Sequence, residues 1–301
     1  MLAITLAHAV GEDAVHGPWY TAWNPDPLIL PCLGLVAVAY TLGIRTLWRR
    51  AGVGHGITGA QAGAFFLGML VLFIALVSPI DVLASERASI HMGQHMLIML
   101  AAAPLLILGM PSRVLLFALP RFSRSRLGAA LCRMPGPYLL WQPLLMWALY
   151  ALTLWVWHLP TLYEAALHHE PIHDAQHLAF LVTACLFWRV LIDPLSRRRL
   201  NLGLGMLYLF TASLQASALG VFLALSPRLW YRAYATPTQP WQLTPLEDQQ
   251  LAGLIMWMPG CVLYAAVAAL MCYLWINRLQ ANPHRRRAAL HAGSPTPIPN
   301  P

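Results

Sequence analysis

Two pairs of histidines with the same spacing are the residues of this chain best suited to chemistry. His91 and His95 lie four residues apart in the motif HMGQHM, and His173 and His177 repeat that spacing in HDAQHL. In an α-helix, side chains four residues apart project from the same face, so each pair can ligate a single metal ion. If the two segments are neighbouring helices that run in the same direction, the four imidazoles converge at one depth.

The residues beside the first pair favour copper over the other metals that bind imidazole. Met92 and Met96 repeat the four-residue interval on the adjacent face of the same segment. Imidazole binds zinc, copper, iron and nickel, whereas a thioether selects Cu(I). Zinc is the alternative if neither methionine is a ligand. Haem fits less well, because axial ligation between two helices uses one histidine from each and leaves the other without a role.

The elements that carry these residues are expected to be transmembrane helices. Of the 301 residues, 58% are hydrophobic and only 10% are charged, whereas about a quarter of the residues of a soluble domain are charged. An apolar run of about 20 residues is long enough to cross a bilayer as a helix. The sequence therefore predicts an all-α, polytopic bundle of seven transmembrane helices, with spans at residues 28–47, 61–80, 90–110, 138–158, 173–192, 201–225 and 250–276.

The distribution of arginine predicts which ends of the spans face the cytoplasm. All 19 basic residues are arginines, and 16 of them lie at the ends of the first, third and fifth spans, in the loops that follow these spans or in the C-terminal tail. Cytoplasmic loops are enriched in basic residues, so the N-terminus is predicted outside and the C-terminus inside. The chain then divides into a periplasmic lead (1–27), the seven-helix domain (28–277) and a basic, proline-rich cytoplasmic tail (278–301). This placement explains the net charge of +8 without nucleic-acid binding.

Four prolines lie inside the predicted spans, namely Pro31, Pro104, Pro143 and Pro259. A proline inside a helix removes one backbone hydrogen bond. In a membrane protein, neighbouring helices are expected to satisfy the carbonyl groups that are left free.

Three further polar residues are expected near the histidines. His158 ends the fourth span in WHLP, and Glu247 and Asp248 precede the seventh in PLEDQQ. Polar groups inside a membrane are costly and commonly face a bundle interior or a functional site. His158 is thus a further candidate ligand, although a single histidine of this kind is more often a hydrogen-bonded packing residue. The two carboxylates are expected to attract a cation or to orient the imidazoles without binding the metal.

The motifs together resemble a known family of bacterial membrane proteins. The segments that carry the resemblance are SPIDVLASERASIHMGQHMLIMLAAAPLLILGMP, WHLPTLYEAALHHEPIHDAQHLAFLVTACLFW and PLEDQQLAGLIMWMPG. They are similar to the cytochrome c oxidase assembly factor CtaG family over about residues 28–277. The resemblance implies a seven-helix membrane fold associated with copper insertion into haem–copper oxidases. At the family's motif positions stand His91, Met92, His95, Met96, His158, His173, His177, Glu247 and Asp248.

The function expected from the residues and the resemblance is not enzymatic. The chain is expected to bind copper, with Cu(I) favoured, at the periplasmic face of the bacterial inner membrane, and to assist metallation and assembly of cytochrome c oxidase. Its expected partners are the oxidase subunits, a periplasmic copper donor and the lipid bilayer. The alternatives are a copper transporter, a haem-binding membrane redox protein, and a metal-free scaffold for the oxidase.

Overall fold

The part of the chain that the structure describes is helical. The structure is a computed structural model, and it describes residues 23–120, 122–126, 142–193, 200–235 and 243–292. Most of the predicted lead and the proline-rich end of the predicted tail lie outside these residues. The elements are α2 (Ile29–Ala51), α3 (Gly59–Val77), α4 (Pro79–Ala84), α5 (Ala88–Met96), η2 (Leu97–Ala102), α6 (Ala103–Leu108), α7 (Pro111–Ala118), α9 (Pro143–Trp157), α10 (Pro160–His168), α11 (Glu170–Ile192), α12 (Leu202–Ala224), η4 (Arg232–Tyr234) and α13 (Pro245–Ala292).

Six helical segments among the described residues are long and apolar enough to cross a membrane. They are α2, α3, the continuous run α5–η2–α6, α11, α12 and the part of α13 that ends at Asn277. The span predicted at 138–158 differs, because α9 has 15 residues and is followed by α10 after a bend of 73°. Leu159 lies at this bend in an extended conformation, as is typical of a residue before proline. The number of spans reaches the predicted seven if the bent pair is one span.

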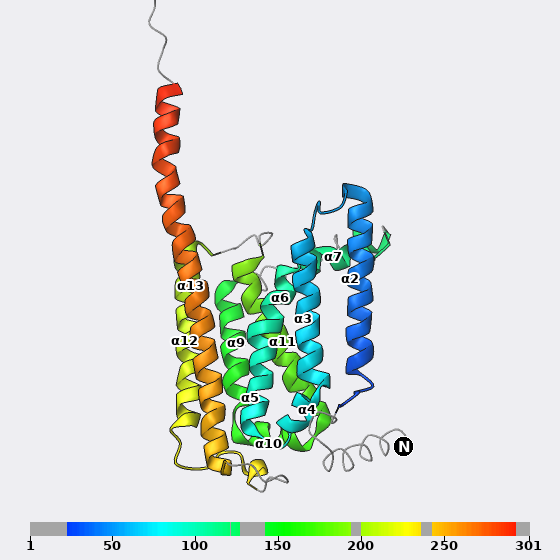
Figure 1. The fold of residues 1–301 in the computed structure, drawn as a ribbon, viewed down its shortest axis with the longest axis vertical. Coiled ribbons are helices and arrows are strands. Elements are labelled where there is room, and N and C mark those ends of the chain that lie inside the picture. The colour runs from blue at the N-terminus through cyan, green and yellow to red at the C-terminus, as the bar shows by residue number, and fades with distance from the viewer. Residues whose placement is uncertain (1–22, 121, 127–141, 194–199, 236–242, 293–301) are drawn as a thin grey trace, which may run out of the picture.

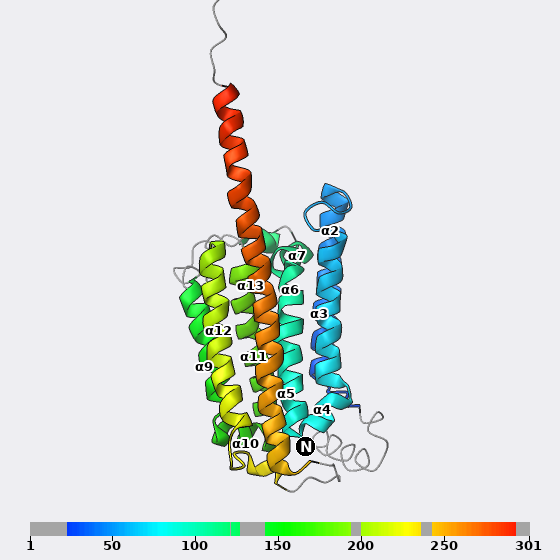
Figure 2. The same cartoon turned by 60° about the vertical axis from the view of Figure 1, so that its left-hand side comes forward.

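The run α5–η2–α6 lies at the centre of the bundle. It contacts α3 on one side and α11 and α13 on others, while α12 packs on α13 and α9. The helix α2 lies at the edge, where it contacts α3 and α7, as Figures 1 and 2 show. The two segments that carry the histidine pairs are therefore neighbours, as a shared site requires.

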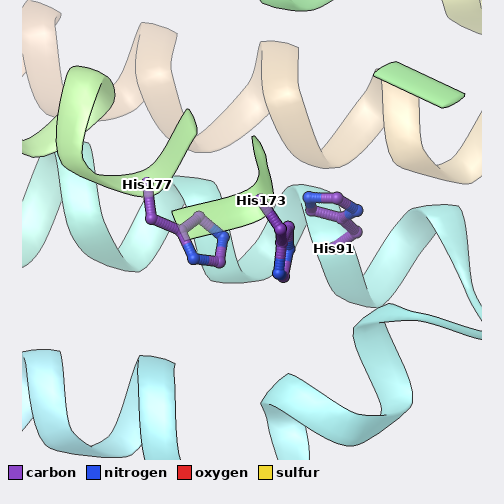
Figure 3. Close-up of side chains that lie close together, drawn as sticks. All are labelled: His91, His173 and His177. Carbon is purple, nitrogen blue, oxygen red and sulfur yellow. The ribbon is translucent and has the colours of Figure 1, made fainter. Parts of the chain in front are cut away.

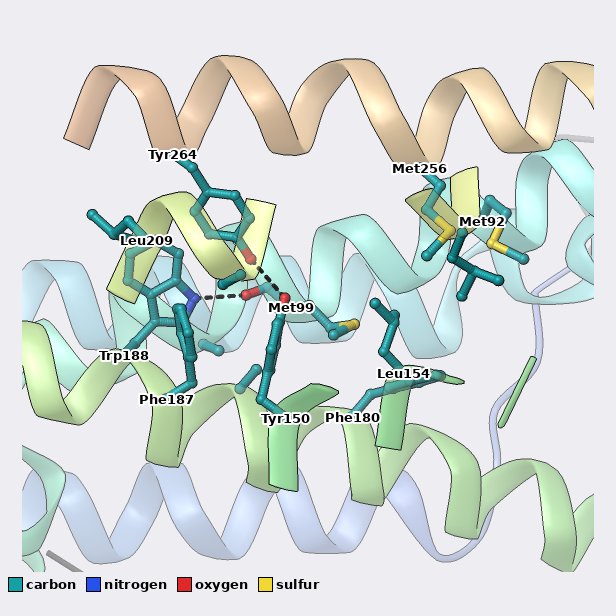
Figure 4. Close-up of a cluster of buried hydrophobic side chains, with 14 of the residues drawn as sticks. Met92, Met99, Tyr150, Leu154, Phe180, Phe187, Trp188, Leu209, Met256 and Tyr264 are labelled. Carbon is teal, nitrogen blue, oxygen red and sulfur yellow. Dashed lines mark hydrogen bonds between the residues drawn. The ribbon is translucent and has the colours of Figure 1, made fainter. Parts of the chain in front are cut away.

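A segment of π-helix interrupts the central run directly after the first histidine pair. The segment η2 is followed by α6, which has Pro104 in its first turn. Pro104 has no N–H to donate to the preceding turn. The carbonyl of Met99 instead accepts a hydrogen bond of 2.9 Å from the indole Nε1 of Trp188 in α11 (Figure 4). A neighbouring helix thus supplies the missing donor, as the sequence predicts for Pro104.

The last helix is longer than the sequence predicts. It runs for 48 residues, from Pro245 to Ala292, and so continues beyond the predicted end of the last span into the predicted tail. The alanine, arginine and leucine residues of this stretch are among the best helix formers and favour the continuation, whereas Pro283 within it opposes helix formation. Figures 1 and 2 show that this end of α13 projects past the other helices.

Two glycines bring α12 and α13 into close contact. A Cβ atom on Gly253 would lie 2.5 Å from the carbonyl oxygen of Gly220 and 2.5 Å from the backbone nitrogen of Ala224. Small residues of this kind let the backbones of membrane helices approach one another. The contact packs α13 closely against α12, and α13 in turn contacts α5.

The two ends of the bundle differ in composition. The histidine pairs lie in the short helix α5 and in the first two turns of α11, towards the end where α4 and α10 lie (Figure 1). The last turn of α2 carries Arg49 and Arg50, at the opposite end of the bundle, near α7. The histidines are therefore separated by the thickness of the bundle from these arginines, which the sequence assigns to a cytoplasmic loop.

Candidate metal centre

The helix that carries the first histidine pair is fixed at its start by a carboxylate from another helix. The backbone N–H of Ala88 donates to Oδ2 of Asp248 at 2.8 Å, and the hydroxyl of Ser89 donates to Oδ1. Asp248 is buried in the first turn of α13. A carboxylate at a helix N-terminus satisfies free N–H groups and complements the helix dipole. Asp248 therefore sets the position of α5, and with it that of His91 and His95.

Three imidazoles from two helices converge at this end of the bundle. One nitrogen from each of His91, His173 and His177 lies within 4.8 Å of the other two (Figure 3). We call these residues the three-histidine group; His91 and His177 are buried and His173 is half-buried. Nitrogen ligands of one tetrahedral ion lie about 3.4 Å apart when each bond is about 2.1 Å. The group is thus wider than a closed site by about 1.4 Å at most, which side-chain rotation can cover.

His95 extends this group towards the interior of the bundle. Its ring centroid lies 4.3 Å from that of His91, 5.4 Å from that of His177 and 6.2 Å from that of His158. Both of its ring nitrogens are buried and have no hydrogen-bond partner among the described residues. His95 therefore lies between the three-histidine group and His158.

The three-histidine group contains buried nitrogens that lack a partner. Within the described part of the chain, Nε2 of His91, His173 and His177 each have no hydrogen bond. Buried polar atoms are nearly always paired, and an unpaired one costs about 1–3 kcal/mol. Three unpaired nitrogens on imidazole rings that lie this close together therefore fit a metal ion better than they fit a packed protein interior.

Tyr234 determines which nitrogen of His91 carries the proton. Its hydroxyl lies 3.0 Å from Nδ1 of His91 and 3.0 Å from the carbonyl oxygen of Ala84. The carbonyl can only accept, so the hydroxyl donates its single proton to Ala84 and accepts from the Nδ1–H of His91. Burial raises the pKa of Tyr234 above its ordinary value, which keeps the hydroxyl protonated. Nε2 of His91 is left with the free lone pair that a metal ligand needs.

His158 and Met92 form a second contact next to His95. Nδ1 of His158 lies 2.7 Å from the carbonyl oxygen of Leu154 and therefore donates to it. Nε2 of His158 faces Sδ of Met92 at 3.4 Å, and both side chains are buried. His158 and Met92 are thus brought together near His95, although His158 lies outside the three-histidine group.

Met96 lies on another side of α5. It lines an apolar recess between the central run and α13, together with Ile90, Gly93 and Ile255. At about 100° per residue, Met96 is about 60° from Gly93, whereas His91 and His95 are each about 160° from it. Met96 therefore points away from the face of α5 that carries His91 and His95. The structure does not bring it to the histidines.

The two carboxylates predicted near the histidines, those of Asp248 and Glu247, lie in different surroundings and have different partners. Asp248 holds the start of α5, so it acts on the imidazoles through the backbone of that helix. Glu247 is exposed and forms a capping box at the start of α13, where its Oε2 accepts from the backbone N–H and the hydroxyl of Thr244 at 2.7 and 2.8 Å. The described contacts of Glu247 are thus with its own helix terminus.

Three further polar residues lie at the site, and one of them, Tyr234, carries no signal in the sequence motifs. Tyr234 belongs to a loop between α12 and α13 that has no metal-binding spacing. Asp81 accepts hydrogen bonds from Gln94 at 2.7 Å and from Asn24 at 2.8 Å. Burial raises the pKa of Asp81, and its proximity to His173 works in the opposite direction. Gln94 lies between His91 and His95 in sequence, and it also donates to the carbonyl of Ala75, so it ties α5 to α3.

Several mycobacterial proteins are similar to this chain. Uncharacterized proteins of Mycobacterium bovis (strain ATCC BAA-935 / AF2122/97) and Mycobacterium tuberculosis (strain CDC 1551 / Oshkosh) are each 26% identical over an alignment of 247 residues that covers 79% of this chain and 37% of theirs. An uncharacterized protein of Mycobacterium leprae (strain TN) is 24% identical over an alignment of 274 residues that covers 83% of this chain and 40% of its own. The chain thus spans less than half the length of these curated relatives. No solved structure matches the chain.

A family model covers most of the chain. The model described as the cytochrome c oxidase caa3 assembly factor matches residues 38–278, which include both histidine pairs, His158 and Asp248. The matched region begins in α2 and ends in α13, so it contains every helix that contributes to the site. The chain therefore belongs to the Caa3_CtaG family of cytochrome c oxidase caa3 assembly factors.

Proposed function

We propose that this chain binds copper in the inner membrane and assists the metallation of a haem–copper cytochrome c oxidase. The observation that carries the proposal is the convergence of three imidazoles, those of His91, His173 and His177, each of which has a buried Nε2 atom without a hydrogen-bond partner among the described residues. Neutral imidazoles bind both copper and zinc. Membership of a family of oxidase assembly factors favours copper, because the oxidase contains that metal.

The proposed site faces the periplasm. The support for this orientation is the separation of the histidines from the arginine-rich loops, which are typical of the cytoplasmic side. A periplasmic copper donor and the oxidase subunits are then the partners. The chemistry is ligand exchange: the ion passes from the donor to the imidazoles and from them to the oxidase, and no covalent bond of a substrate is made or broken.

The proposal is tested by the metal content of the full chain purified in detergent, after anaerobic exposure to Cu(I) and desalting. The variants are His91→Ala with His95→Ala, and His173→Ala with His177→Ala. The matched control is His168→Ala with His169→Ala, because these two histidines are exposed next to α11. We expect the wild type and the control to retain the same copper, and each of the other two variants to lose at least one ion per chain.

Copper content that is equal in all four proteins would refute the proposal. A wild type that retains zinc but not Cu(I) would replace copper with zinc in the same site. Copper flux into sealed vesicles would show a transporter, and a Soret absorbance in the purified protein would show a haem protein. Each outcome therefore separates the proposed role from one of its alternatives.

A further inference from the structure

Hydrogen bonding does not explain the contact between His158 and Met92. Nδ1 of His158 uses its proton on the carbonyl of Leu154, so Nε2 carries only a lone pair. The thioether of Met92 has no proton to donate. Two atoms that can only donate electron pairs thus face each other at 3.4 Å.

The separation of these two atoms matches the spacing of ligands on one ion. A nitrogen at about 2.0 Å and a sulfur at about 2.3 Å from a tetrahedral ion lie about 3.5 Å apart. The observed 3.4 Å is close to this value without any rearrangement of the side chains. His158 and Met92 are 2% and 0% exposed, so bulk water is not a partner for either atom.

The surroundings of this contact select a soft ion of low charge. Met92 belongs to the large buried hydrophobic cluster, which also contains Leu154, Phe180 and Met256 (Figure 4). The cost of burying an ion rises with the square of its charge, so a divalent ion costs about four times as much as a monovalent one in such a place. Thioether and imidazole are also the ligands that favour Cu(I).

The contact is separate from the three-histidine group. His158 is not among the residues whose nitrogens lie within 4.8 Å of one another. His95 lies between the two places, with ring centroids 5.4 Å from His177 and 6.2 Å from His158, and neither of its nitrogens has a partner among the described residues. One imidazole is therefore available to either place.

We propose that His158 and Met92 form a second, inner position that holds Cu(I), distinct from the outer three-histidine group and connected to it by His95. The inference rests on the proposed copper function and assigns different roles to the two positions. The outer group exchanges metal at the end of the bundle, and the inner position admits only the monovalent soft ion. Two of its ligands are the Nε2 atom of His158 and the Sδ atom of Met92, and His95 supplies a further nitrogen.

The test is X-ray absorption at the copper edge together with Cu(I) titration against a chromogenic chelator, on the full chain in detergent. Met92→Leu removes the sulfur and keeps the side-chain volume. Met99→Leu is the matched control, because Met99 is equally buried in the same helical run. We expect a copper–sulfur distance of about 2.3 Å in the wild type and in the control. Met92→Leu should lose that scattering and bind the inner ion at least about 10-fold more weakly, while nitrogen scattering remains.

The variant His173→Ala with His177→Ala tests whether the two positions are separate. We expect it to lose copper bound through nitrogen alone and to keep the copper–sulfur scattering. Loss of that scattering in this variant, with a thermal unfolding midpoint equal to that of the wild type, would show a single site and overturn the inference. An unchanged spectrum in Met92→Leu would also overturn it, whereas a wild type that binds no copper at all would instead refute the proposed function.

Discussion

Substitution of Tyr234 by phenylalanine removes one hydroxyl and its hydrogen bonds with His91, Ala84 and Tyr163. The Nδ1–H of His91 loses its acceptor, and the carbonyl of Ala84 loses its donor. An unpaired buried group costs about 1–3 kcal/mol, so we expect the free energy of unfolding to fall by about that amount. Partners that orient a ligating histidine are worth about 10- to 100-fold in metal affinity, so Tyr234→Phe should weaken Cu(I) binding by a factor in this range.

The measurements are thermal unfolding of the detergent-purified protein and competition with a Cu(I) chelator. Tyr150→Phe is the control, because its hydroxyl is also buried and hydrogen-bonded, with Tyr264 at 2.7 Å, but has no contact with the histidines among the described residues. We expect Tyr150→Phe to lose a similar amount of stability and to keep the copper affinity of the wild type. The comparison separates loss of stability from loss of the imidazole's orientation.

Equal copper affinity in Tyr234→Phe and in the wild type would refute the reasoning from the tautomer of His91. The same conclusion would follow if both tyrosine variants lost affinity to the same extent, because the effect would then be one of stability. A shift that is confined to Tyr234→Phe, in the stated range, is the expected result.

Two other substitutions test how the central run is held. Trp188→Phe removes the donor to the carbonyl of Met99, so the free energy of unfolding should fall by about 1–3 kcal/mol; an unchanged unfolding midpoint would contradict the assigned role of Trp188. Asp248→Asn removes the charge at the start of α5 and should cost about 0.3–2 kcal/mol in the same assay, with weaker Cu(I) binding. The neighbouring change Glu247→Gln preserves the capping box and should leave both quantities as in the wild type.

The sequence predicts the helices and the histidine pairs because both follow from periodicity. A run of about 20 apolar residues determines a span, and a four-residue interval determines a face, so these features are visible in the chain alone. The four-residue interval does not show which of two adjacent faces of a helix points towards the site. Met92 and Met96 each follow a histidine of the first pair by one residue. Of the two, Met92 contacts an imidazole, that of His158, in the described part of the chain. The sequence does not reveal this contact, because His158 lies at the end of a different helix.

Tyr234 and the different positions of the two carboxylates could not be predicted, because they depend on contacts between distant segments. Tyr234 and His91 are 143 positions apart in the chain. Asp248 and Glu247 are adjacent and chemically alike, yet one is buried against α5 and the other caps its own helix. Which carboxylate faces inward is decided by the rotation of α13, and that rotation depends on its packing against α12 and α5.

The π-helix between the first histidine pair and α6 accommodates one additional residue without redirecting the imidazoles. A π-turn holds about one residue more than an α-turn, so the chain makes the same rotation with one more residue. Deletion of one residue within Leu97–Ala102 would therefore allow a regular α-helix in which His91 and His95 keep about the same direction relative to α6. In a regular α-helix, by contrast, a deletion rotates the two sides by about 100° relative to each other. The wide turn is thus a place in the central run where a change of one residue in length can be absorbed while the imidazoles still point at His173 and His177.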